Sequence, residues 1–295
     1  DVSNIAADKI NSTLAGNETA DAILIIGSHV RWEAPLVNPR IRKAAGNGAK
    51  VFVIGPEWET TYSAEFLGND LKILNRLPKT LTDALTAAER PAVILGGMAL
   101  AKGALAPALK LVDKFGLVKE SWSGFNVLHM SAARMGSLML DFTVEGGMAE
   151  IAAAKPKVVL SLGADEMDFA PFADSLKVYI GHHGDKGAHA ADIILPAASY
   201  AEKDGTYVNT EGRVQFAEKA VFAPGDARED WTILRALADA LGVNVGFDSF
   251  DELQLAMIAQ VPALGEEGLA DYGALPKPDA GANAEGEITA YPIAD

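Results

Sequence analysis

Six short apolar runs that each stop at a glycine or a proline set the strongest limit on what this chain can fold into. None of them alternates apolar with polar side chains over its length. An uninterrupted apolar run suits a strand that is buried on both faces, as strands of a parallel sheet are. The six runs are AILIIG (22–27), KVFVIG (50–55), AVILGG (92–97), KVVLSLG (157–163), KVYIG (177–181) and DIILP (192–196).

Helical patterns lie between these runs, and the sequence predicts helices at residues 34–45, 80–88, 99–115, 126–140 and 148–153. Alternating strands and helices predict an α/β fold of the Rossmann-like type, with a doubly wound and mostly parallel sheet. After Pro196 the pattern changes. A β-hairpin is predicted at 205–215, and an amphipathic helix at 228–241 that stops at Gly242. We therefore expect an α/β region over residues 1–247 and an acidic C-terminal helix with an extended tail over 248–295.

The net charge of −15 is unevenly distributed, because −9 of it lies in residues 248–295. Nucleic acids and anionic membrane surfaces bind basic patches, so the acidic surplus argues against both as partners. From about Gly265 the tail is rich in Gly, Ala and Pro and has no regular period. It is either a frayed terminus or an arm that gains order only against a partner. The start at Asp1 predicts a fragment or a processed chain, and the longest uncharged runs are too short to span a membrane.

The sequence contains no cysteine, which excludes disulfides, cysteine nucleophiles and cysteine-ligated iron–sulfur clusters from this stretch. Three histidines fall within residues 182–189, but none has the HxxxH or HExxH spacing of a metal site. We interpret that segment as a solvated loop in which the adjacent histidines point apart. We interpret His29 and His129 as hydrogen-bonded structural histidines. No Gly-x-Ser-x-Gly element supports a hydrolase triad.

Ligands of an open parallel sheet bind beyond the carboxyl ends of its strands. The loops expected there contain neither GxGxxG nor GxxxxGK[ST]. Two of them are acidic, at residues 55–61 and 163–168. Because carboxylates repel phosphate groups, these loops disfavour dinucleotide binding.

Residues 191–215, ADIILPAASYAEKDGTYVNTEGRVQ, closely resemble a signature of the molybdopterin oxidoreductase family. The matching pattern is AD-hydrophobic-LP, then E-x-x-G, then N-x-E-x-R-x-Q. Residues 224–242 are similar to the next helix of that family, and residues 27–56 to its first Rossmann-like unit. The resemblance covers about residues 20–242.

Within that family the sequence resembles the branch of large iron–sulfur subunits of respiratory complex I, the NADH:quinone oxidoreductases. The similar segments are RWEAP (31–35) and WSGFNVLHMSAARMG (122–136). The resemblance implies the C-terminal part of such a protein, whose iron–sulfur clusters are bound by cysteines in N-terminal modules. It implies partners in the peripheral arm of the complex. It also implies a peripheral location on the cytoplasmic side of the bacterial inner membrane, or on the matrix side in mitochondria.

Three loops depart from the pattern of catalytic members of the family. This chain has Ser28-His29 where those members commonly have Asn, and Gly55-Pro56-Glu57 where they have an acidic-Pro-Arg element. It has Gly163-Ala164-Asp165 where they have Gly-x-Asn. The residues Ser28, His29, Gly55, Glu57, Gly163 and Asp165 therefore mark a vestigial pocket. We expect no molybdopterin, no metal and no catalytic residue in this chain.

Three functions follow as hypotheses. The first is a structural scaffold of complex I, with electron transfer from NADH to quinone carried by clusters outside this segment. The second is the cofactor-binding half of an active molybdenum oxidoreductase of the formate-dehydrogenase type. A third is an α/β domain of a thiamine- or nucleotide-dependent enzyme.

Overall fold

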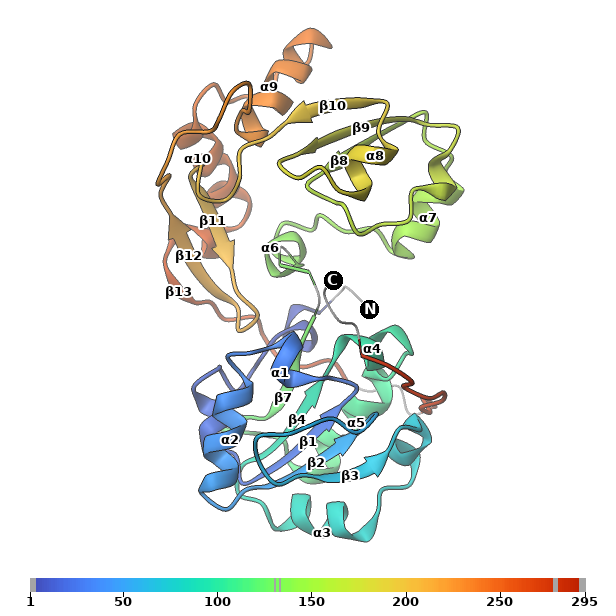
Figure 1. Cartoon of the computed structure of the whole chain (residues 1–295). Helices are drawn as coiled ribbons and strands as arrows, with labels where there is room; N and C mark the ends of the chain where they lie inside the picture. Colours follow the sequence, from blue (N-terminus) through green and yellow to red (C-terminus); the bar gives the residue numbers. More distant parts are fainter. Residues whose placement is uncertain (1–3, 130, 133, 278–280, 292–295) are drawn as a thin grey trace. The chain divides into compact units, whose positions relative to one another are not determined.

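The computed structural model describes residues 4–129, 131–132, 134–277 and 281–291. The chain divides into two compact units (Figure 1). The first unit comprises Asp1–Gly136, Val208–Arg213 and Leu269–Asp295, and the second comprises Ser137–Tyr207 and Val214–Gly268. The expected boundary after residue 247 does not coincide with this division. The region expected as one over residues 1–247 is divided after Gly136, and of the expected tail, residues 248–268 belong to the second unit and residues 269–295 to the first.

A five-stranded parallel sheet forms the centre of the first unit, in the order β3-β2-β1-β4-β7. The chain moves outward from β1 through β2 to β3, then returns to place β4 on the other side of β1. The topological switch point is therefore between β1 and β4. The strands are β1 (Ala22–Ile26), β2 (Lys50–Ile54), β3 (Glu65–Gly68), β4 (Pro91–Leu95) and β7 (Phe125–Val127).

Both faces of this sheet are buried, as its continuous apolar strands predict. Alternate residues of β1 face opposite cores: Leu24 and Ile26 pack with α3 and α5, whereas Ile23 and Ile25 pack with α2. The helices of this unit are α1 (Val30–Glu33), α2 (Asn38–Gly46), α3 (Lys79–Ala87), α4 (Gly97–Ala101) and α5 (Leu105–Phe115). A two-stranded antiparallel ribbon is formed by β5 (Val118–Lys119) and β6 (Trp122–Ser123).

The second unit contains a smaller parallel sheet in the order β10-β9-β8. Its strands are β8 (Val158–Leu162), β9 (Leu176–Gly181) and β10 (Ile193–Pro196). The predicted hairpin is present as β11 (Gly205–Val208) and β12 (Arg213–Ala217). A third strand, β13 (Gly268–Leu269), lies beside β12 in the same sheet. The remaining helices are α6 (Arg134–Met139), α7 (Gly147–Ala153), α8 (Lys186–Ala190), α9 (Asp230–Ala240) and α10 (Phe250–Gln260).

The α/β fold class and all six predicted strands are confirmed, but the helix predicted at 126–140 is wrong in its first half. Residues 125–127 pair with β4 as an edge strand, and the helix α6 begins only at Arg134. The helix predicted at 99–115 is interrupted between α4 and α5 around Gly103, which has a positive φ of 73°. Within the described residues, no helix has both the length and the apolar composition that crossing a membrane requires.

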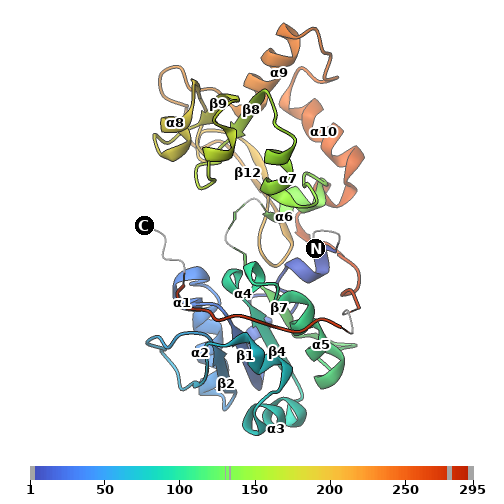
Figure 2. The same cartoon turned by 90° about the vertical axis from the view of Figure 1, so that its right-hand side faces the viewer.

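The tail differs from its sequence interpretation over the residues described. Residues 281–291 are extended, as expected, but they pack on the first unit of the same chain. Figure 2 shows this segment, coloured dark red, crossing the first unit from α5 past α4 to α1. We call residues 281–291 the strap. Residues 278–280 and 292–295 lie outside the described part of the tail.

Candidate functional site

The candidate site is the carboxyl edge of the five-stranded sheet at the switch point between β1 and β4. In a doubly wound sheet this is the place where a ligand binds. Gly27 follows β1 and Gly96 follows β4, and the Gly96 N–H donates to Ile26 O at 2.8 Å. A side chain at Gly27 would lie 2.7 Å from Ala99 Cβ and from Ile288 Cδ1, and Gly27 has a φ of 62°. Glycine is therefore required where the two loops approach each other.

Ser28 and His29 are brought to this edge, and a single carboxylate organises both. The Ser28 hydroxyl donates to Glu33 Oε2 at 3.0 Å, and the His29 backbone N–H donates to Glu33 Oε1 at 2.8 Å. Burial raises the pKa of Glu33, although these two hydrogen bonds oppose the shift. Ser28 is fully buried and His29 is 4% exposed. The sequence does not predict Glu33 as a site residue, because its carboxylate reaches Ser28 and His29 only when residues 30–33 fold as α1.

The His29 ring lies within a group of aromatic side chains. It stacks on Trp32 with ring centroids 3.7 Å apart, and its centroid is 4.4 Å from that of Trp58 and 5.6 Å from that of Tyr291. Burial lowers the pKa of His29, and Arg31 lowers it further against an opposing backbone hydrogen bond. Aromatic and apolar side chains therefore surround the His29 ring, but its buried Nδ1 has no hydrogen-bond partner among the described residues, unlike the hydrogen-bonded histidine that the sequence predicted.

Gly55 and Glu57, the two sequence-predicted pocket residues after β2, have different surroundings. The Tyr291 hydroxyl donates to Pro56 O at 2.9 Å and lies against Gly55, where any side chain would collide with it. Glu57 is exposed to solvent. The structure therefore brings Ser28, His29 and Gly55 together around the strap and leaves Glu57 outside the group.

The strap fills the crevice between these loops. Its Ile288 is fully buried in the core beside Gly27 and Ala99, and Ala284 is 1% exposed. Leu71 N–H donates to Gly286 O and Ile288 N–H donates to Asn69 O, each at 2.9 Å. The sequence did not predict this feature, because the strap has no strand period and its contacts are with segments far away in the chain.

A bound pterin or dinucleotide does not fit this crevice. The Ile288 side chain occupies the space above Gly27, where a cofactor would approach the backbone at the switch point. The Glu33 carboxylate, which accepts hydrogen bonds from Ser28 and His29 at this edge, would repel phosphate when ionised. Over the described residues, this edge therefore presents an aliphatic side chain and a carboxylate, which do not match a phosphate-bearing cofactor.

Gly163 and Asp165, the predicted pocket residues of the second unit, follow β8. Asp165 Oδ1 accepts the Gly187 N–H at 2.8 Å, and Asp165 Oδ2 accepts the Tyr179 hydroxyl at 2.7 Å. A side chain at Gly187 would lie 2.5 Å from Asp165. Asp165 thus fastens α8 to β9 through both carboxylate oxygens.

The family signature at 209–213 also serves internal contacts. Asn209 Oδ1 accepts the N–H groups of Glu211 at 3.1 Å and of Arg213 at 2.9 Å, which closes the turn of the hairpin. Glu211 Oε2 accepts the Leu14 N–H at 2.7 Å, and Glu211 Oε1 accepts Arg213 Nε–H at 2.9 Å. These side chains attach the turn to the N-terminal segment of the first unit.

The histidines at 182–189 form no metal centre in the described part of the chain, where no group of three His, Asp or Glu side chains is placed to hold an ion. The expectation that adjacent histidines point apart is wrong here. The rings of His182 and His183 lie edge to face with centroids 4.3 Å apart.

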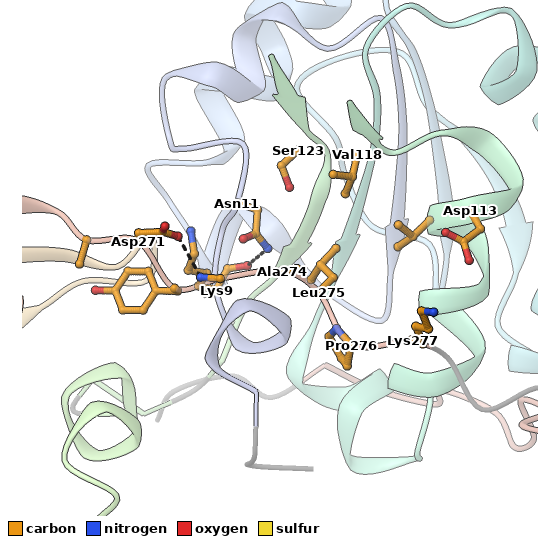
Figure 3. A pocket seen from close by; sticks show the side chains of 14 residues that line it. Lys9, Asn11, Asp113, Val118, Ser123, Asp271, Ala274, Leu275, Pro276 and Lys277 are labelled. Carbon is orange, nitrogen blue, oxygen red and sulfur yellow. Dashed lines mark hydrogen bonds between the residues drawn. The ribbon is translucent and has the colours of Figure 1, made fainter. Parts of the chain in front are cut away.

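A separate groove of about 530 Å³ lies on the first unit, lined by Lys9, Asn11, Val118 and residues 270–277 (Figure 3). Burial lowers the pKa of Lys9 against the opposing charges of Glu211 and Asp271. The Asn11 amide donates to Ala6 O at 2.8 Å and to Phe125 O at 2.7 Å. Because these polar groups face internal partners, and because the groove is away from the carboxyl edge, we do not assign it a catalytic role.

The first unit is a doubly wound α/β sheet, and a segment of the same chain occupies the switch point where such folds bind ligands. Comparison with known proteins gives its family. Residues 2–240 match the molybdopterin oxidoreductase family. The chain belongs to that family.

Curated relatives are similar over most of this chain. It is 43% identical over 263 residues to the NADH-ubiquinone oxidoreductase 78 kDa subunit, mitochondrial, of Neurospora crassa. It is 39% identical over 265 residues to the NADH-ubiquinone oxidoreductase 75 kDa subunit of Reclinomonas americana. It is also 39% identical over 267 residues to an NADH-quinone oxidoreductase subunit of Rickettsia bellii. These matches cover 86%, 86% and 88% of this chain but only 35%, 38% and 38% of the relatives.

Proposed function

We propose that this chain is a structural, non-catalytic portion of the large iron–sulfur subunit of an NADH:quinone oxidoreductase, respiratory complex I. Sequence identities of 39–43% over more than four fifths of the chain, to NADH-ubiquinone and NADH-quinone oxidoreductase subunits, support the assignment. These relatives give no support to the alternative of an active molybdenum oxidoreductase. In this proposal the chain stabilises the arm through which electrons pass and carries out no chemical step itself.

The observation that carries the scaffold role is the position of Ile288 in the switch-point crevice. A family member that bound a cofactor at this edge would need the space that Ile288 fills. The side chains that the sequence marked as a pocket are instead used for folding, as the contacts of Ser28 with Glu33 and of Asp165 with Tyr179 indicate. No molybdopterin is therefore part of the proposal.

Electron transfer from NADH to quinone requires redox centres, and the proposal places them elsewhere in the subunit. Iron–sulfur clusters are held by cysteine thiolates, and this chain has none among its 295 residues. The partners proposed are the other subunits of the peripheral arm. The location proposed is peripheral, on the cytoplasmic side of the bacterial inner membrane or on the matrix side in mitochondria.

Affinity purification of the full-length protein from its native membranes tests the assignment. The proposal expects NADH:quinone oxidoreductase activity and several further subunits to co-purify with it. A substitution in this chain that leaves the subunit folded, such as Ser28→Ala, should leave the turnover of the purified complex unchanged. Purification of the protein without those subunits, or with a formate-oxidising activity, would contradict the proposal.

A further inference from the structure

We propose that the carboxyl edge of the first unit, around Gly27 and Gly55, is a peptide-binding groove, and that its ligand is the strap of the same chain. This groove is not the groove of Figure 3. This inference does not depend on membership of complex I. It assigns the edge a ligand of a stated chemical class: an extended peptide with a buried aliphatic side chain and an aromatic side chain three residues later.

The groove binds the strap through its backbone. The hydrogen bonds of Leu71 and Ile288 form an antiparallel bridge between Asp70 and Glu287. The Asn75 side chain adds a second contact. Its amide nitrogen donates to Ala284 O and its amide oxygen accepts the Ala284 N–H, both at 2.9 Å. Such contacts recognise an extended backbone whatever its side chains are.

Side chains at three positions of the strap contact the groove and provide selectivity. Ala284 and Ile288 are buried in the core of the first unit, and Tyr291 packs against the His29 ring and against Gly55. The acidic residues between them, Glu285 and Glu287, are exposed. The groove therefore selects apolar anchors, and the acidity of the tail is not what holds it in place.

The glycines of the edge are shaped for this ligand. The positions after β1 and β2, Gly27 and Gly55, have φ values of 62° and 150°, and a side chain at either would collide with the strap. Gly27 receives Ile288, and Gly55 receives the ring of Tyr291.

Peptide binding in trans tests the groove directly. In the full chain, Ile288→Asp places a charge in the core and should release the strap. A synthetic peptide GANAEGEITAY, with the sequence of residues 281–291, should then bind this variant and change the fluorescence of Trp58, which lies beside His29. The wild-type chain should bind the peptide at least tenfold more weakly, because its groove is already filled. The same peptide carrying the Ile288→Asp change should not bind.

Two further measurements keep the test decisive. Thr289→Asp, at an exposed neighbouring position, is the matched control and should leave the strap in place. Hydrogen exchange on the wild-type chain should show the amides of Leu71 and Ile288 protected well above free-peptide rates. This measurement decides the matter if Ile288→Asp fails to fold. Failure of the peptide to bind a folded Ile288→Asp chain, or free-peptide exchange at Leu71 and Ile288, would overturn the proposal.

Discussion

Glu211 illustrates how a residue of the family signature can serve folding. It is 6% exposed, and its carboxylate accepts one backbone N–H from Leu14 and the Arg213 guanidinium N–H. Burial raises the pKa of Glu211, but the hydrogen bonds from Leu14 and Arg213 outweigh burial and hold the pKa below its usual value. A carboxylate that is bound this way stabilises the fold only while it is ionised.

We predict that Glu211→Gln lowers the free energy of unfolding by about 1–3 kcal/mol at neutral pH, because it weakens two hydrogen bonds to a buried charge. The folded-state pKa is lowered, so the stabilisation is complete above the unfolded pKa and is lost as the pH falls through the folded pKa. Urea unfolding at several pH values measures both effects. The difference between wild type and variant should shrink in acid, and the exposed Glu57→Gln should show almost none at any pH.

Asp165 and Tyr179 give a second prediction at this scale. Burial, together with the hydrogen bond to Asp165, raises the pKa of Tyr179 to about 12. The stabilisation that this provides is complete below the unfolded pKa and is lost as the pH rises through the folded pKa. Asp165→Asn removes the neighbouring negative charge, so the Tyr179 phenol should titrate at lower pH. Ultraviolet titration detects the change, with Tyr179→Phe identifying the signal. An unchanged titration would show that Asp165 does not contact the phenol.

At the residue scale, the sequence predicts which loops lie at the carboxyl edges of the strands but not which side chains pack against those loops. The strand ends predicted the loops that contain Ser28, His29 and Gly55, since a strand end in a parallel sheet fixes where its loop lies. The choice of these residues within the loops came from the resemblance to the molybdopterin oxidoreductase family. Glu33, Ile288 and Tyr291 were missed. Their roles depend on the folded arrangement of α1 and of the strap, and no local spacing records such contacts.

Among the elements, the strands that are buried on both faces were predictable because burial imposes a continuous apolar run. The strands β3 and β7 were missed for the opposite reason. Each is at an edge of the sheet and is only three or four residues long, so little apolar sequence is required. The apolar residues of β7 were instead assigned to the helix that follows.

The helix α10 carries a prediction of its own. The Ser249 hydroxyl accepts the Glu252 N–H at 3.2 Å, and Glu252 Oε2 accepts the Asp248 N–H at 2.6 Å, so the two side chains cap the first turn together. Ser249→Ala should lower the free energy of unfolding by about 1 kcal/mol. Ser249→Asn, which keeps a side-chain acceptor, should restore most of the loss in the same chemical denaturation experiment. Equal stability of all three chains would exclude the cap.

At the scale of the whole molecule, the chain does not divide where its composition changes. The acidic tail looks like a separate segment in the sequence, yet residues 269–295 group with the N-terminal unit because the strap packs on its sheet. The composition of a segment averages over all of its residues, whereas the packing of the strap on the first unit depends on a few buried side chains such as Ala284 and Ile288. Those anchors are too few to change the composition of the tail.

Metal analysis of the full-length protein, purified from its native membranes with its partners, tests the central claim most directly. The account predicts no molybdenum above background, because the strap fills the switch point between β1 and β4. It predicts iron in the preparation, because the proposal places the iron–sulfur clusters in other parts of the subunit and in its partners. Stoichiometric molybdenum would contradict it, since the metal would show that this fold still holds its family's cofactor.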